Sequence, residues 1–109
     1  MKLYIGGAYQ GQAELARQEN PAAEHWPDFH ENVREAVLTG GQDPRSFAEQ
    51  FCAAHPDAVV SANEVGAGVV PVAAEERAFR EAVGRVLCVI AEKAEQVTRC
   101  VCGIGVRIK

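Results

Sequence analysis

The stretch Val59–Pro71, VVSANEVGAGVVP, decides how the rest of the chain is arranged. An apolar β-branched run leads into a polar pair, Asn63 and Glu64, then into two glycines, Gly66 and Gly68, before a proline closes the segment. This order is typical of a buried strand, a loop and the start of a helix. Open α/β sheets bind ligands at loops beyond the carboxyl ends of their strands. The pattern therefore predicts a site at Asn63 and Glu64, or else a plain turn in which the glycines serve only backbone geometry.

The length of 109 residues predicts a single domain, over residues 1–109. Hydrophobic residues make up 48%, which is enough for a real but small core, and a homo-oligomer is expected on that account. The net charge is −4, with no basic stripe, which argues against a nucleic-acid partner. No apolar run approaches the roughly 18 residues of a membrane span, and the first residues do not resemble a signal peptide. We expect a cytoplasmic protein with no membrane partner.

The first residues read as strand, glycine-rich turn and helix. A short strand over residues 2–5 runs into GGAYQGQ and then into the helix-forming AELARQE. Gly6 and Gly11 have the spacing of the phosphate-binding pattern G-x-x-x-x-G-K-[ST], with Gly7 between them. Backbone N–H groups at such a helix start favour an anion. The alternative is a plain tight turn.

The two positions of that pattern whose side chains contact phosphate and magnesium are changed. Gln12 stands in place of the lysine and Ala13 in place of the serine or threonine. The lysine gives a full charge to the outer phosphates, and the hydroxyl is a magnesium ligand. Gln12 can donate only a neutral hydrogen bond, so weak phosphate binding is compatible with the sequence while phosphoryl transfer is doubtful.

The middle of the chain predicts a loop and two helices. Residues 20–27, with two prolines, read as a loop. Asp28 is the expected N-cap of a short helix that ends near residue 40, and a second helix over residues 44–54 starts at a proline. His30 lies in the first turn of the first helix, and we interpret it as a surface residue, or alternatively as a general base near the site.

A long helix follows Pro71, and the chain ends in two strands around Gly103 and Gly105. Apolar residues recur along the helix at the spacing of one face. Arginines cluster in its first half. Arg80 and Arg85 either form ion pairs along the solvated face, as Arg85 would with Glu81, or reach a phosphate.

The four cysteines are expected to be reduced and packed. Their neighbours are those of helix faces and strands, not of a disulfide scaffold. Cys100 and Cys102 would place both sulfurs on one face of a strand. Two thiolates without a nearby histidine fall short of a zinc site, so we expect no structural metal.

Three segments in one register, NEVGAGVVP, RAFREAVGR and the terminal GIGVRIK, resemble the adenosylcobinamide kinase / adenosylcobinamide-phosphate guanylyltransferase family of cobalamin biosynthesis. YIGGAYQGQ is similar to its phosphate loop. The resemblance implies a P-loop-like three-layer α/β fold with a mainly parallel sheet flanked by helices, usually oligomeric. It also implies GTP or ATP as substrate, adenosylcobinamide as acceptor and a guanylylated histidine. The candidate nucleotide-binding residues are Gly6, Gly7, Gly11, Gln12, Asn63, Glu64, Gly66, Gly68, Arg80 and Arg85.

The chain also departs from the family. Leu87 and Cys88 replace a common Asn-Gln pair, the middle is shorter, and neither an acidic strand end for magnesium nor the histidine segment is evident. His30 is a weak candidate for the catalytic histidine. Two hypotheses follow. In the first, the protein is a relative that binds GTP or ATP, with or without magnesium, and turns over slowly. In the second, it is a non-catalytic nucleotide-binding, corrinoid-binding or regulatory relative.

Overall fold

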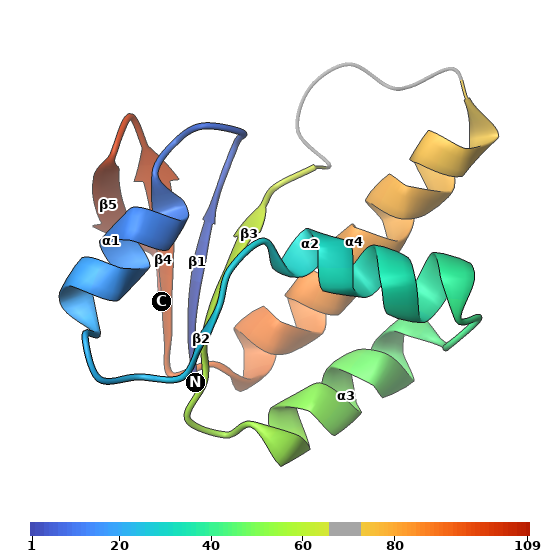
Figure 1. The fold of residues 1–109 in the computed structure, drawn as a ribbon, viewed down its shortest axis with the longest axis horizontal. Coiled ribbons are helices and arrows are strands. Elements are labelled where there is room, and N and C mark those ends of the chain that lie inside the picture. Colours follow the sequence, from blue (N-terminus) through green and yellow to red (C-terminus); the bar gives the residue numbers. More distant parts are fainter. Residues whose placement is uncertain (66–72) are drawn as a thin grey trace.

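A computed structural model describes residues 1–65 and 73–109 as a five-stranded sheet with helices on both faces (Figure 1). The strands are β1 (Lys2–Gly6), β2 (His25–Trp26), β3 (Val59–Asn63), β4 (Gln96–Val101) and β5 (Ile104–Arg107). The helices are α1 (Gln12–Glu19), α2 (Phe29–Val33), the π-helix η1 (Arg34–Thr39), α3 (Pro44–Ala54) and α4 (Ala74–Lys93). Gly66 and Gly68 lie outside the described residues. In the part of the chain that is described, no helix is long and apolar enough to cross a bilayer.

The sheet order is β2-β3-β1-β4-β5, and only β5 runs antiparallel to its neighbour. The central strand β1 pairs with β3 and β4 in register, so that Leu3 lies beside Val60 and Val97. The carboxyl ends of β1, β2 and β3 therefore meet at one edge of the sheet. The predicted α/β class with a mainly parallel sheet is confirmed.

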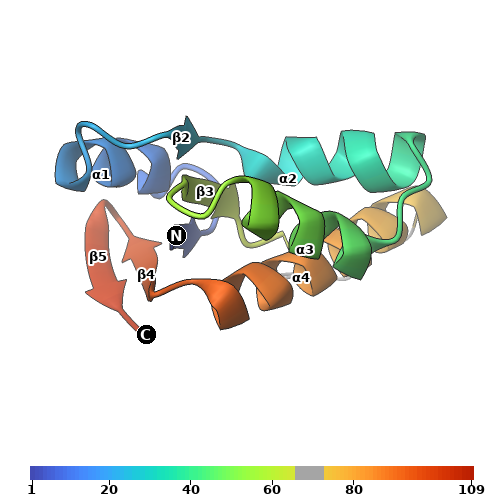
Figure 2. The ribbon, with the colours of Figure 1, turned by 90° about the horizontal axis from the view of Figure 1, so that it is seen from below.

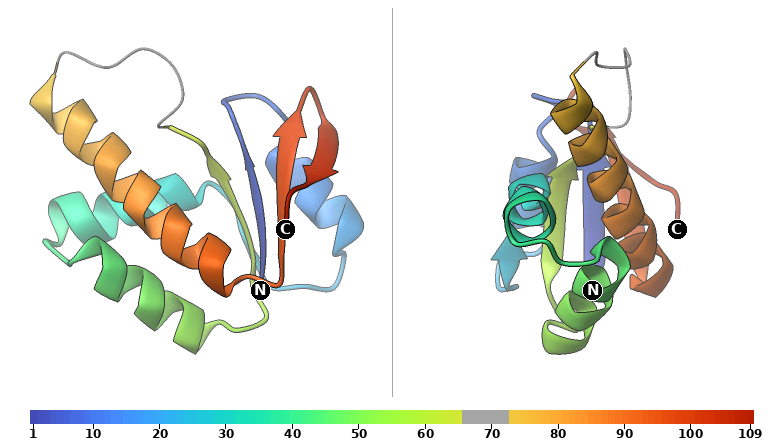
Figure 3. Two further views of the ribbon diagram at one scale, coloured as in Figure 1. Left: turned by 180° about the vertical axis from the view of Figure 1, so that it is seen from behind. Right: turned by 90° about the vertical axis from the view of Figure 1, so that its right-hand side faces the viewer.

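Alternate residues of β1 serve two separate cores, as the pleat of a strand requires. Leu3 packs with Val60 and Val83 on the α4 side, whereas Tyr4 packs with Ala16 and Cys100 on the α1 side. α1 lies on one side of the sheet, and α2, α3 and α4 lie on the other (Figures 2 and 3). These layers leave the loops at the carboxyl edge of the sheet uncovered.

An aromatic cluster fixes the edge of the sheet near β2. Phe29, which is fully buried, contacts Trp26, Phe47 and Phe51 with ring centroids 4.6 to 6.4 Å apart. The N-cap of α3, Asp43, accepts the backbone N–H of Ser46, and this hydrogen bond lowers the pKa of its carboxyl group. Because Phe29 is the first residue of α2 and packs on Phe47 and Phe51 of α3, α3 holds the start of α2 in place.

Two expectations for the middle of the chain are corrected. The segment predicted as a loop over residues 20–27 contains the short strand β2, which pairs with Val59 and Val60. The helix predicted to end near residue 40 is α-helical only to Val33 and continues as the π-helix η1. The spacing of apolar residues does not distinguish an α-helix from a π-helix over so short a segment, because one wider turn displaces that spacing by only one residue.

Tyr4 is the polar centre of the α1 side. Its hydroxyl donates to Glu19 at 2.6 Å and accepts from the side-chain amide of Asn20 at 3.0 Å. Burial, followed by the hydrogen bond to Glu19, raises the pKa of Tyr4 to about 12. Lys2 donates to the same Asn20 at 2.9 Å, so this network ties the end of α1 to β1.

The raised pKa of Tyr4 predicts a loss of stability at high pH. The unfolded chain releases the phenolic proton near pH 10 and the folded chain only near pH 12, so the contribution of Tyr4 is complete below pH 10 and falls between these values. A shift of this size corresponds to about 2–3 kcal/mol. Urea unfolding at pH 8 to 12 should show this additional decline in the wild type and not in Tyr4→Phe. Parallel declines in both proteins would contradict it.

Candidate functional site

The turn between β1 and α1 is shaped by its glycines. A Cβ atom on Gly6 would lie 2.7 Å from the carbonyl oxygen of Cys100, and Gly11 has a φ of 83°. Gln10 ties the turn to the β4–β5 hairpin, because its side-chain oxygen accepts the N–H of Cys102 at 2.6 Å and its backbone oxygen accepts that of Gly103 at 2.9 Å. The hydrogen bonds to the β4–β5 hairpin thus fix the turn, and the first residues of α1 lie at the carboxyl edge of the sheet.

Gln12, at the position where the phosphate pattern has lysine, closes the turn onto β3. Its side-chain nitrogen lies 2.8 Å from Oδ1 of Asn63 and 3.2 to 3.4 Å from the backbone oxygens of Gly6, Gly7 and Ala62. The side chain is buried. A neutral amide therefore fills the centre of the turn with four oxygens around one nitrogen, a set of acceptors that also suits an ammonium group.

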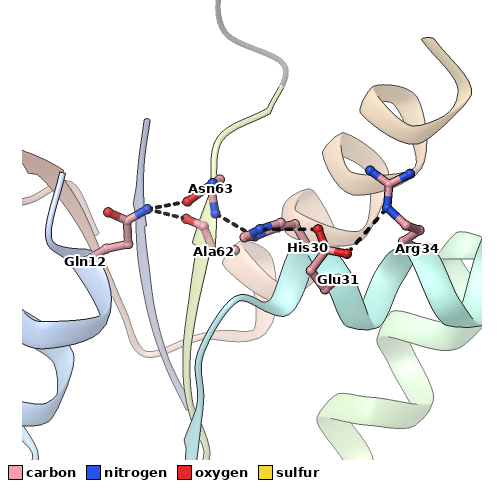
Figure 4. Close-up of polar contacts among 6 residues, drawn as sticks. All are labelled: Gln12, His30, Glu31, Arg34, Ala62 and Asn63. Carbon is pink, nitrogen blue, oxygen red and sulfur yellow. Dashed lines mark hydrogen bonds and ion pairs between the residues drawn. The ribbon is translucent and has the colours of Figure 1, made fainter. Parts of the chain in front are cut away.

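A chain of polar contacts continues from Asn63 into α2 (Figure 4). The backbone N–H of Asn63 donates to Nδ1 of His30 at 3.1 Å, which assigns the ring proton of neutral His30 to Nε2. Nε2 lies 3.8 Å from Oε1 of Glu31, whose other oxygen lies 3.5 Å from Nε of Arg34. The guanidinium of Arg34 stacks 3.8 Å above the ring of Phe79 in α4. Gln12 is therefore connected to α4 through a continuous set of contacts.

His30 is not the surface residue that the sequence favoured. Only 8% of it is exposed, because the first turn of α2 packs against the end of β3. Its spacing from Val33 and Val37 places it on the apolar face of the helix, a signal that the polar neighbours Asp28 and Glu31 obscured. The general-base interpretation stays untested, although the ring does lie at the sheet edge.

A pocket of about 210 Å³ opens beside the first turn of α1. Its walls include the backbone of Gly11, the buried Ser61 and two carboxylates, from Glu14 and Asp28. Asp28 occupies the N-cap position of α2 as predicted, yet its side chain caps no N–H group. It follows β2 by two residues, so a carboxylate stands near the carboxyl edge of the sheet.

The remaining candidates lie elsewhere. Glu64 donates its backbone N–H to Gly6 at 2.7 Å, yet its side chain lines a groove on the α4 side. Arg80 and Arg85 line another groove, of about 500 Å³, between α4 and the start of α3, where Arg85 forms the predicted ion pair with Glu81 at 2.8 Å. The structure thus brings together Gly6, Gly7, Gly11, Gln12 and Asn63 and places the two arginines apart from them.

The cysteines do not share one environment. All four are free thiols, and burial raises the pKa of Cys100 and Cys52. Cys102 is exposed in the hairpin turn with a φ of 51°, so the expectation that Cys100 and Cys102 share a strand face is wrong. Among the described residues, no three His, Cys, Asp or Glu side chains are grouped so as to hold a metal.

A mainly parallel sheet, with a glycine turn and polar side chains at its carboxyl edge, places the protein in the α/β class, whose members commonly bind ligands at that edge. The chain belongs to the cobinamide kinase / cobinamide phosphate guanyltransferase family, whose model matches residues 29–108, more than half of its length. This match includes α2, the end of β3 and α4, and begins after the glycine turn. None of the curated proteins matches the chain.

Proposed function

We propose that this family member binds GTP or ATP beside the Gly6–Gly11 turn and catalyses phosphoryl or guanylyl transfer to a cobinamide slowly. The observation that carries the proposal is the position of Gln12, enclosed by the turn at the carboxyl ends of β1 and β3. The N–H groups at the start of α1 favour a phosphate there, because the first N–H groups of a helix have no internal acceptor. A neutral Gln12 adds no charge to this attraction.

Magnesium is expected to make up part of the missing charge. Glu14 and Asp28 both line the pocket, and two carboxylates repel a bare triphosphate. Magnesium is commonly held by one or two carboxylates together with substrate phosphates. Asp28, at the carboxyl edge, is the residue that fits this role. When bound, the metal would neutralise phosphate charge, and nucleotide binding should therefore depend on it.

Slow turnover is expected because the site lacks the charge and the hydroxyl group of the phosphate-binding pattern. Removal of a charged group that stabilises a transferring phosphoryl typically costs about 3–4 kcal/mol of transition-state stabilisation. Ala13 supplies no hydroxyl, and Nδ1 of His30 already accepts the N–H of Asn63. Nε2 of neutral His30 then carries the ring proton beside Glu31, so neither ring nitrogen has a free lone pair with which to attack a phosphate. A cytoplasmic location is part of this proposal, because GTP and ATP are available there.

The second candidate function is a non-catalytic relative that binds a nucleotide or corrinoid, or regulates a partner. The engagement of Gln12 with four oxygens favours it, because a side chain that stabilises the turn leaves less room for a phosphate. Both candidates retain the same fold.

Calorimetric titration of GTP and ATP, with and without magnesium, tests the proposal. The wild type should bind in a magnesium-dependent manner, and Gln12→Lys should bind at least about tenfold more tightly, because a charge-assisted hydrogen bond contributes about 1.5–3 kcal/mol. Gln18→Lys, on the exposed side of α1, carries the same added charge away from the turn and should bind as the wild type does.

The outcomes separate the two candidates. Binding by the wild type, followed by transfer to adenosylcobinamide, supports the slow enzyme. Binding without transfer, even in Gln12→Lys, supports the non-catalytic relative. If neither protein binds either nucleotide, the nucleotide site is refuted.

A further inference from the structure

A second pocket, of about 390 Å³, lies between the α2–η1 segment and α3 and is here called the aromatic pocket. Its walls combine aromatic rings with polar side chains, among them Trp26, Phe47, Phe51, Asn32, Glu35 and Gln42. Small-molecule sites typically have volumes of about 300–1,000 Å³ and such a mixed lining. The aromatic pocket shares no lining residue with the pocket beside α1. It is therefore a separate candidate site.

The rings of the aromatic pocket are held at fixed angles by the aromatic cluster. Trp26 packs edge-on against Phe51, with ring centroids 5.1 Å apart and ring planes at 88°. Phe47 stacks on the buried Phe29, with ring centroids 5.9 Å apart and ring planes at 17°. Trp26 and Phe47 are only partly buried, so part of their ring surface is open to a ligand. The face of an aromatic ring carries partial negative charge and attracts a cation.

The polar side chains of the aromatic pocket have no partner among the described residues. Glu35 is exposed on η1, and its carboxylate forms neither an ion pair nor a hydrogen bond within that part of the chain. The side-chain amides of Asn32 and Gln42 likewise form no hydrogen bond with described residues. Within the same part of the chain, no arginine, lysine or histidine lines the pocket. The charge of the pocket is therefore negative, which disfavours an anion and suits a cation.

The backbone at the end of η1 brings two of these polar side chains together. Gln42 donates its backbone N–H to Ala36 at 3.0 Å, and Gly40 donates its own to Glu35 at 2.9 Å. A Cβ atom on Gly40 would lie 2.8 Å from the backbone oxygen of Ala36, so this closure requires a glycine. π-helical turns are rare and occur frequently at functional sites. The end of η1 thus places Glu35 and Gln42 at the same pocket.

We propose that the aromatic pocket binds a small organic cation, a primary arylalkylammonium ion. The apolar part of the ion lies against the rings of Trp26 and Phe47, and its ammonium group pairs with Glu35. The amide oxygens of Asn32 and Gln42 accept its remaining N–H groups, because an ammonium group has three donors. This inference is independent of the proposed nucleotide site.

Titration with the phenethylammonium ion, followed by ¹H–¹⁵N NMR spectra, tests the proposal. The chain contains one tryptophan, so the single indole N–H signal of Trp26 reports directly on the pocket. This signal and the amide signals of residues 32–42 should shift in a saturable manner, with a dissociation constant below about 1 mM. Neutral 2-phenylethanol has the same ring and carbon chain without the charge, and it should bind at least about tenfold more weakly.

Substitutions separate the contribution of the charge from that of the rings. Glu35→Gln should weaken the binding of phenethylammonium by about tenfold and leave that of phenylethanol unchanged. Glu49→Gln removes the same charge from the opposite face of α3, outside the pocket, and should bind as the wild type does. Phe47→Leu keeps an apolar side chain without the ring and should weaken the cation by about threefold more than the alcohol. Thermal unfolding verifies that the variants fold.

Three outcomes would overturn the proposal. The first is the absence of a saturable shift with phenethylammonium throughout the millimolar range. The second is equal affinity for the ion and the alcohol, which would mean that the pocket does not recognise charge. The third is equal weakening in Glu35→Gln and Glu49→Gln, which would show that the ion responds only to the net negative charge of the protein.

Discussion

Replacement of Phe29 by alanine should lower the free energy of unfolding by about 3–5 kcal/mol, the largest loss expected from a single substitution in this chain. The ring is fully buried and contacts Trp26, Phe47 and Phe51, so its removal leaves a cavity that three other rings cannot fill. Domains of this size are stable by only about 5–15 kcal/mol. Urea unfolding followed by circular dichroism measures the change.

The matched control for Phe29→Ala is Leu38→Ala. Leu38 is 38% exposed on η1, and its truncation should cost less than about 1 kcal/mol. Phe29 stands between Asp28 and His30, so the same substitution should also reduce nucleotide affinity if that site exists. Equal losses of stability in the two variants would show that the aromatic cluster does not anchor α2.

Gly6→Ala should cost about 1–3 kcal/mol, whereas Gly7→Ala, one residue later, should be nearly neutral. The added Cβ at Gly6 would lie 2.7 Å from a backbone oxygen of β4, which cannot move without loss of sheet pairing. At Gly7 the nearest atom is 3.8 Å away and belongs to a flexible side chain. Both variants add the same methyl group, so a difference in their stability reports the steric contact at Gly6.

Thermal and urea unfolding of both variants measure this difference. Gly7→Ala should be neutral or slightly more stable than the wild type, because replacing glycine reduces the conformational freedom of the unfolded chain. A neutral Gly6→Ala would mean that β1 and β4 are farther apart at the turn than the structure places them.

The sequence was sufficient to predict the elements with strong periodicity. β1, β3, α3 and α4 follow from apolar runs, a proline at a helix start and a long amphipathic pattern. β2 could not be predicted in this way, because two residues carry no alternation and a strand that short depends on the neighbour β3 for its hydrogen bonds.

The candidate site was only partly predictable. Gly6 and Gly11 have a recognisable spacing, and Asn63 follows a strand, so their meeting at one edge follows from the topology. The engagement of Gln12 with β3 depends on two segments separated by 50 residues, and local sequence carries no signal for it. The hairpin turn was partly predictable, because a two-residue turn with positive φ angles, as at Cys102 and Gly103, favours a glycine in its second position.

The attachment of Gln10 to the β4–β5 turn has a consequence for how the protein folds. The hydrogen bond to Cys102 joins residues 92 positions apart, and contacts of such separation form late because a long loop must first close. The glycine turn therefore takes its final shape only after the last two strands have joined the sheet. A ribosome-bound chain that has not yet emerged through residue 102 has its first strand but not the finished glycine turn, so a nucleotide at the proposed site could not assist folding at that stage.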